Sequence, residues 1–178
     1  MKDVLYSLFA DYRTQIVFLH VMSAVVWVGG MIAMRFAAHH SIQMLETAPL
    51  KLQRTAHALK RLFAIVSPFV VILIITAVIM AVGLGFRAAA VDADGKVIDE
   101  VAMHLYQLIH VKEVIWMIMS INLGAMILRR NKAQKFLDKN DFSGAKSQIE
   151  LIGRYMVPLN IILGIIAIYL GVTLRNGY

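Results

Sequence analysis

Four long apolar runs alternate with short polar connections along the chain. The runs are Ile16–Ala38, Leu62–Phe86, Leu105–Leu128 and Tyr155–Leu174. Each holds roughly 20 residues or more, and a helix of that length crosses the ~30 Å hydrocarbon layer at ~1.5 Å per residue. The pattern predicts an all-α membrane protein with four transmembrane helices in an up-down bundle. The expected helix bounds are about 15–38, 62–86, 104–128 and 154–174.

The composition agrees with this class of protein. Hydrophobic residues make up 60% of the 178 residues, more than a soluble domain of this length can bury. The connections are short, so residues 1–178 are expected to form a single integral membrane domain. Cysteine is absent, which excludes disulfides, thiolate metal sites and haem attached through C-x-x-C-H. No small-residue cleavage site closes the first run, so we expect it to remain as the first helix.

The net charge of +7 is unevenly distributed among the connections. The basic residues after the first and third runs are Lys51, Arg54, Lys60, Arg61, Arg129, Arg130, Lys132, Lys135, Lys139, Lys146 and Arg154. The middle connection has only Arg87 and Lys96 against four acidic residues. The positive-inside rule predicts that both termini lie outside, in a multi-pass protein of the inner (cytoplasmic) membrane. Topology thus explains the charge, and the expected partner is the lipid bilayer rather than nucleic acid.

Ionisable residues inside two of the runs are the candidate functional groups, because they are costly in hydrocarbon. His20 and His110 lie at matching depths in the first and third helices, which run in the same direction. Both imidazoles are therefore expected roughly 6–10 Å below the outer surface. Two histidines at one level of a four-helix bundle suit the axial ligation of a b-type haem. Lys112 lies about 200° around the helix from His110, so it should face a different partner. It either forms a simple ion-pair arrangement with Glu113 or takes part in chemistry.

The first helix places small residues beside its histidine. His20, Ser23, Ala24, Trp27 and Gly30 share one stripe at i, i+3, i+4 and i+7 spacing. Ser23 and Gly30 would let a flat macrocycle approach the backbone, and Trp27 would stack on the ring or border its edge. Two other interpretations stay open: His20 only bonds a neighbouring helix, and Trp27 only fills the core.

Methionine supports an alternative cofactor, copper. The chain has 11 methionines, and thioethers with imidazoles are soft ligands that suit Cu(I). Met103 and His104 form a candidate entry site at the outer mouth of the third helix, so His104 is an alternative metal ligand. Methionine as a packing residue is nevertheless the favoured interpretation, because its unbranched thioether side chain fills gaps between helices.

The segment from His20 through Trp27 to Gly30 resembles the first helix of the copper-resistance-D-like (CopD) and HemJ-type membrane proteins. Arg35 followed by His40 resembles the end of that helix in HemJ-type protoporphyrinogen oxidases, and His110-x-Lys112 resembles the start of their third helix. Two departures stand out. The region Ser120 to Leu123 lacks a further HemJ-type histidine, and Tyr155-Met156-Val157-Pro158 replaces their Asn-Glu-x-Pro signature.

The resemblance implies a histidine-bearing four-helix membrane protein that binds haem or a metal. The leading prediction is a haem b redox protein with His20 and His110 as axial ligands. It would transfer electrons to a quinone or oxidise a tetrapyrrole such as protoporphyrinogen IX, as an oxidoreductase. Lys112 is the candidate catalytic residue, and Lys112 and Arg35 are candidate partners of propionates, although Arg35 lies at the opposite membrane face. The alternatives are a copper-handling protein and a subunit without a cofactor, and a homo-oligomer is a further expected partner.

Overall fold

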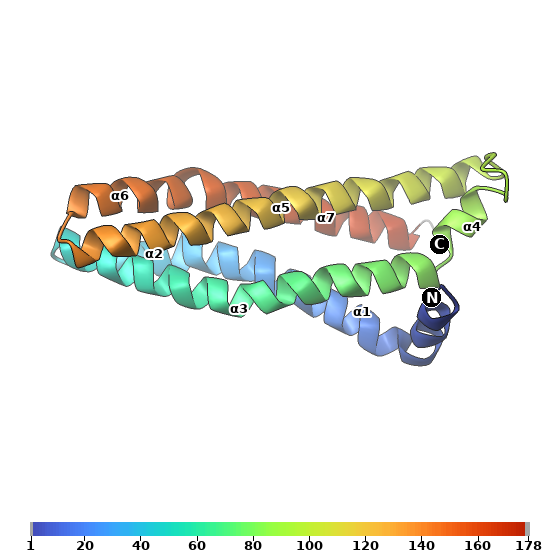
Figure 1. Ribbon diagram of the computed structural model, residues 1–178, viewed down its shortest axis with the longest axis horizontal. Helices are drawn as coiled ribbons and strands as arrows, with labels where there is room; N and C mark the ends of the chain where they lie inside the picture. The colour runs from blue at the N-terminus through green and yellow to red at the C-terminus, as the bar shows by residue number, and fades with distance from the viewer. Residues whose placement is uncertain (1, 177–178) are drawn as a thin grey trace.

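The computed structural model describes residues 2–176, which form a bundle of four long helical rods (Figure 1). In chain order the elements are α1 (Lys2–Ala33), the π-helix η1 (Met34–Ala38), α2 (His39–Gln43), α3 (Ala48–Gly83), α4 (Phe86–Ala90), α5 (Glu100–Asp138), α6 (Phe142–Leu151), the π-helix η2 (Ile152–Met156) and α7 (Val157–Asn176). The first rod runs through η1 into α2, and the fourth runs from α6 through η2 into α7. The expected all-α four-helix bundle is thereby confirmed.

Each of the four rods is long and apolar enough to cross a membrane, so the chain is a multi-pass membrane protein. The two ends of the chain lie at the same end of the bundle, as an even number of crossings requires (Figure 1). We call this the outer end, and the end formed by the α2–α3 and α5–α6 connections the inner end. Which end faces the cytoplasm stays a prediction from the positive-inside rule.

The helices are longer than the apolar runs. α3 begins at Ala48 rather than near residue 62, and α5 continues to Asp138 rather than ending near residue 128. With 39 residues, α5 is about 58 Å long, nearly twice the hydrocarbon thickness. The residues between Ala48 and the second apolar run therefore extend α3, and the bundle continues beyond the expected membrane at its inner end.

Local sequence signals explain several helix boundaries. The Asp99 carboxylate caps α5 by accepting from the backbone N–H groups of Val101 and Ala102. The Asp141 carboxylate caps α6 in the same way through the N–H of Gly144. In the outer connection, Gly95 has a φ of 81°, which glycine adopts without the steric cost of a side chain. These signals set where two of the rods begin.

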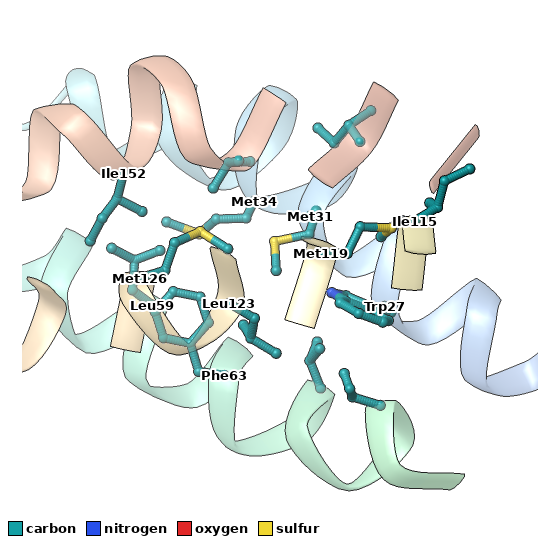
Figure 2. Packing of buried hydrophobic residues seen from close by; sticks show 14 residues of the cluster. Trp27, Met31, Met34, Leu59, Phe63, Ile115, Met119, Leu123, Met126 and Ile152 are labelled. Carbon is teal, nitrogen blue, oxygen red and sulfur yellow. The ribbon is translucent and has the colours of Figure 1, made fainter. Parts of the chain in front are cut away.

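The core has a central cluster and a smaller inner cluster. The central cluster includes Trp27, Met31, Met119 and Met126, which pack with residues of all four rods (Figure 2). Methionine thus serves in packing here, which agrees with its unbranched, adaptable side chain. The inner cluster is built on fully buried alanines, and its buried members are Ala56, Ala133, Leu137, Ala145 and Ile149. Small side chains there let α3, α5 and α6 approach closely.

Two asparagines join α5 to the fourth rod inside the bundle. The Asn122 amide donates to the Met156 carbonyl of η2 and to the Asn160 side-chain oxygen, both at 2.8 Å. The Asn160 amide in turn donates to the Met119 carbonyl at 3.3 Å. Asn160 is buried, so this pairing satisfies groups that would otherwise be costly in an apolar interior.

Candidate functional site

His20 lies half-buried on α1 and contacts α3. Its Nδ1 is 3.0 Å from the Thr76 hydroxyl oxygen. That hydroxyl donates its single proton to its own helix, since Oγ1 is 2.8 Å from the Ile72 carbonyl and 3.0 Å from the Leu73 carbonyl. The Thr76 oxygen can therefore only accept from His20, and we assign the proton to Nδ1. This tautomer leaves Nε2 with a free lone pair.

Lys112 is the charged residue that faces His20. It is half-buried on α5, and its ammonium group is close enough to the His20 imidazole for an electrostatic interaction. Nζ also lies 3.2 Å from the point that a Cβ on Gly171 of α7 would occupy. Among residues 2–176 no carboxylate lies within ion-pair distance of it. The Lys112 side chain thus carries an unpaired cation between α1 and α7.

His110 has a different environment on the same helix. Its side chain is 54% exposed, and Nδ1 lies 3.0 Å from the Glu113 carboxylate one turn along the helix. The ring also packs edge-on against Tyr106, with centroids 4.7 Å apart. Lys112 is turned toward α7, and His110 lies about 200° around α5, so His110 is directed away from the side of α5 that reaches α7. Among the described residues no direct contact joins the two histidines, and His104 is exposed as well.

The small residues of the first helix serve packing. The fully buried Ser23 hydroxyl donates to the Leu19 carbonyl at 2.7 Å, so it is already satisfied. A Cβ at Gly30 would lie 2.9 Å from the Leu62 side chain, which shows that Gly30 allows α1 and α3 to approach. At His20 and Gly30 this stripe contacts α3, because small residues favour close helix contact as readily as ligand contact. Trp27 is only 1% exposed, and in the described part of the chain its indole N–H has no acceptor.

Arg35 lies in a separate place at the inner end. It is half-buried on η1 and lines a cavity with His39 and Arg154. The rise of a helix puts Arg35 about 22 Å along the rod from His20, so the two residues cannot act on one small group. Over the described ranges, no group of three or more histidine or acidic side chains is placed to hold a metal ion.

Sequence reasoning did not assign the roles of Thr76 and Gly171. Both are visible in the sequence, Thr76 as a polar interruption of an apolar run and Gly171 as a small residue in the last helix. Their proximity to His20 and Lys112 depends on how the helices are rotated against each other, and hydropathy does not report that. Comparisons of the chain with protein-family models, with curated proteins and with solved structures give no match.

Proposed function

We propose that this chain binds a haem b or a related tetrapyrrole inside the membrane and uses it for redox work. The proposal rests on a His20 imidazole whose Nδ1 is hydrogen-bonded to Thr76 and which interacts electrostatically with Lys112, an ammonium group without an acceptor among the described residues. An ionisable pair of this kind is costly in hydrocarbon, and a bound group that used both residues would offset that cost. The resemblance of the His20–Trp27–Gly30 segment to haem- and metal-binding membrane proteins supports the same interpretation.

In this proposal one histidine of the chain, rather than two, would hold the haem iron. His20 Nε2 has the lone pair that a haem iron needs, whereas His110 faces away and is engaged by Glu113. We therefore propose His20 as the single histidine ligand, in place of the bis-histidine arrangement expected from the sequence. Lys112 has the charge to hold an acidic substituent such as a propionate, or it supplies a second ligand as an amine. When bound, the haem would supply one-electron redox chemistry.

The residues of the chain orient this group. Thr76 holds His20 Nδ1–H and so fixes the ring plane, as second-layer partners of ligating histidines do. Lys112 places a positive charge between α1 and α7, which favours an anionic substituent there. The absence of a side chain at Gly171 lets the ammonium group approach α7 closely. The redox partner would be a quinone or a tetrapyrrole such as protoporphyrinogen IX, in the inner membrane that the charge pattern predicts.

The visible spectrum of the protein tests the proposal. We expect the chain, expressed with added haem and purified in detergent, to show a b-type spectrum that His20→Ala removes. His57→Ala is the matched control, because His57 is an exposed histidine on α3. A colourless protein that holds stoichiometric copper would contradict the proposal and favour copper handling. Absence of both cofactors after supplementation would contradict both functions.

A further inference from the structure

A second site lies at the inner end of the bundle, where the first and fourth rods meet α3. A cavity of about 230 Å³ opens there. Its floor is apolar and includes Met34, Leu59 and Ile152, which Figure 2 shows converging from η1, α3 and η2. Arg35, His39 and Arg154 supply basic groups to its lining. The cavity thus combines a buried apolar floor with cationic walls.

Both π-helices of the structure line this cavity. In η1 the His39 N–H donates to the Met34 carbonyl, and in η2 the Val157 N–H donates to the Ile152 carbonyl, five residues back in each case. Pro158 is the second residue after η2 and cannot donate a backbone hydrogen bond, which accounts for irregularity there. No proline lies in η1. Single π turns are rare and recur at functional sites, and here two separate rods place one at the same cavity.

The charges of the cavity are incompletely paired. Arg35 is half-buried and makes no hydrogen bond or ion pair with any residue between 2 and 176. Arg154 lies over the Tyr155 ring at 5.5 Å, and its nearest carboxylate is that of Glu150, at 3.9 Å. Both side chains of the Arg154–Glu150 pair are more than half exposed, so this pair is weak. The cavity therefore holds two guanidinium groups against one carboxylate. Guanidinium groups bind phosphates and carboxylates through two parallel hydrogen bonds.

We propose that this cavity binds the acid headgroup of an anionic membrane amphiphile, a phosphate or a carboxylate, with Arg35 as its main partner and Arg154 at the rim. The cavity is smaller than the roughly 300–1,000 Å³ typical of whole-ligand pockets, which suits a headgroup better than a macrocycle. It also lies where the apolar runs give way to basic connections, the level at which lipid headgroups reside. The proposal does not depend on the His20 site.

Native mass spectrometry of the delipidated full chain tests this site. The probes are a phosphatidylglycerol, a phosphatidylcholine with the same acyl chains, and laurate. We expect one tightly held anionic probe per chain and no comparable retention of phosphatidylcholine. Retention of phosphatidylglycerol supports a membrane lipid as the source of the acid group, and retention of laurate alone supports a free carboxylate. Equal retention of phosphatidylglycerol and phosphatidylcholine, with no laurate bound, overturns the proposal.

Three variants locate the binding to the cavity. Arg35→Gln should weaken binding of the anionic probe by about tenfold or more, because it removes a charged hydrogen-bond donor. Gly153 lines the cavity and has open space at its Cβ position, so Gly153→Phe should fill the site. Gly124→Phe is its control, since Gly124 on α5 is equally open but lies outside the cavity.

Glu150→Gln separates binding from folding, because it should increase affinity. It removes the carboxylate that competes for Arg154, and a misfolded variant would not gain affinity. If Gly153→Phe retains the probe as well as Gly124→Phe does, or if Glu150→Gln fails to strengthen binding, the site is not this cavity.

Discussion

The long helix α5 carries two cations in sheltered positions, and they differ in their partners. Arg130, near the inner end, is 8% exposed and donates Nε to the Ala56 carbonyl of α3 at 2.9 Å. Its two terminal nitrogens donate to the side chains of Asn131 and Gln134 at 3.2 and 3.1 Å. Lys112, in the outer half of the same helix, has no acceptor among the described residues.

This difference separates a structural cation, Arg130, from Lys112, the cation for which we propose a functional role. Hydrogen bonds to a charged group contribute about 1.5–3 kcal/mol each, so the Arg130 network offsets much of the cost of sheltering the guanidinium. The hydrogen bond from Arg130 to the Ala56 carbonyl also joins α5 to α3 beyond the apolar run. Nothing comparable among the described residues offsets the cost at Lys112, and this supports the proposal that Lys112 binds a group from outside the chain.

The largest effect expected is on stability at Arg130. Arg130→Met should lower the free energy of unfolding by about 2–3 kcal/mol, because it leaves the Ala56 carbonyl without its donor. Lys112→Met should leave stability unchanged or raise it, because it removes an unpaired charge. Thermal unfolding of the detergent-solubilised, cofactor-free protein measures both. Lys135→Met, at an exposed position on α5, is the control. A larger loss in Lys112→Met than in Arg130→Met would reverse the assignment.

A second prediction concerns Thr76. Thr76→Val keeps the shape of the side chain and removes the oxygen that accepts from His20 Nδ1. We expect haem affinity to fall by about 10- to 100-fold, the usual effect of losing the partner of a ligating histidine. Thr76→Ser retains the hydroxyl and should stay near the parent affinity. Haem titration followed by absorbance measures this, and equal affinities for Val and Ser would show that Thr76 does not orient the ring.

A third prediction is a smaller effect on stability, at the Asn122–Asn160 pair. Each amide lies between α5 and the fourth rod, and each also reaches a backbone carbonyl. A double-mutant cycle with Asn122→Ala and Asn160→Ala should give a coupling of about 0.6 kcal/mol, with an upper range near 1.7 kcal/mol, as found for polar pairs in membrane bundles. Denaturant unfolding in mixed micelles measures it. Strictly additive losses would mean that the two amides do not act together.

The sequence predicted the number, order and approximate place of the helices, because a run of about 20 apolar residues forms few structures other than a transmembrane helix. It did not predict where the helices end. Hydropathy indicates which residues lie in the hydrocarbon layer. Beyond that layer α3 and α5 continue as amphipathic helices, which pack against each other through buried alanines such as Ala56 and Ala133. The cavity at the inner end was also not predicted, because it is lined by two π turns and residue spacing does not reveal π turns.

The candidate site shows a second limit. Helical periodicity separates Lys112 from His110 by about 200°, but it does not say which of them faces the first helix. In a soluble bundle the apolar stripe would decide this. A membrane helix is apolar on most sides, so its rotation is set by packing, here by small residues such as Gly30 and Gly171. The interpretation of His110 as a ligand depended on that undetermined rotation.

The smallest effect is therefore expected at His110, the outward-facing neighbour of Lys112. His110→Ala should change stability by no more than about 0.5 kcal/mol, since it removes only an exposed pair within one helix. It should also leave the haem spectrum and affinity unchanged, in contrast to His20→Ala. Absorbance spectra and unfolding curves of the two variants, prepared side by side, measure this. If His110→Ala removes the spectrum as His20→Ala does, α5 must be rotated by about half a turn in the loaded protein, and Lys112 would then face outward. In that event the comparison between Lys112 and Arg130 would lose its basis, because Lys112 would be an exposed lysine with no need of a partner.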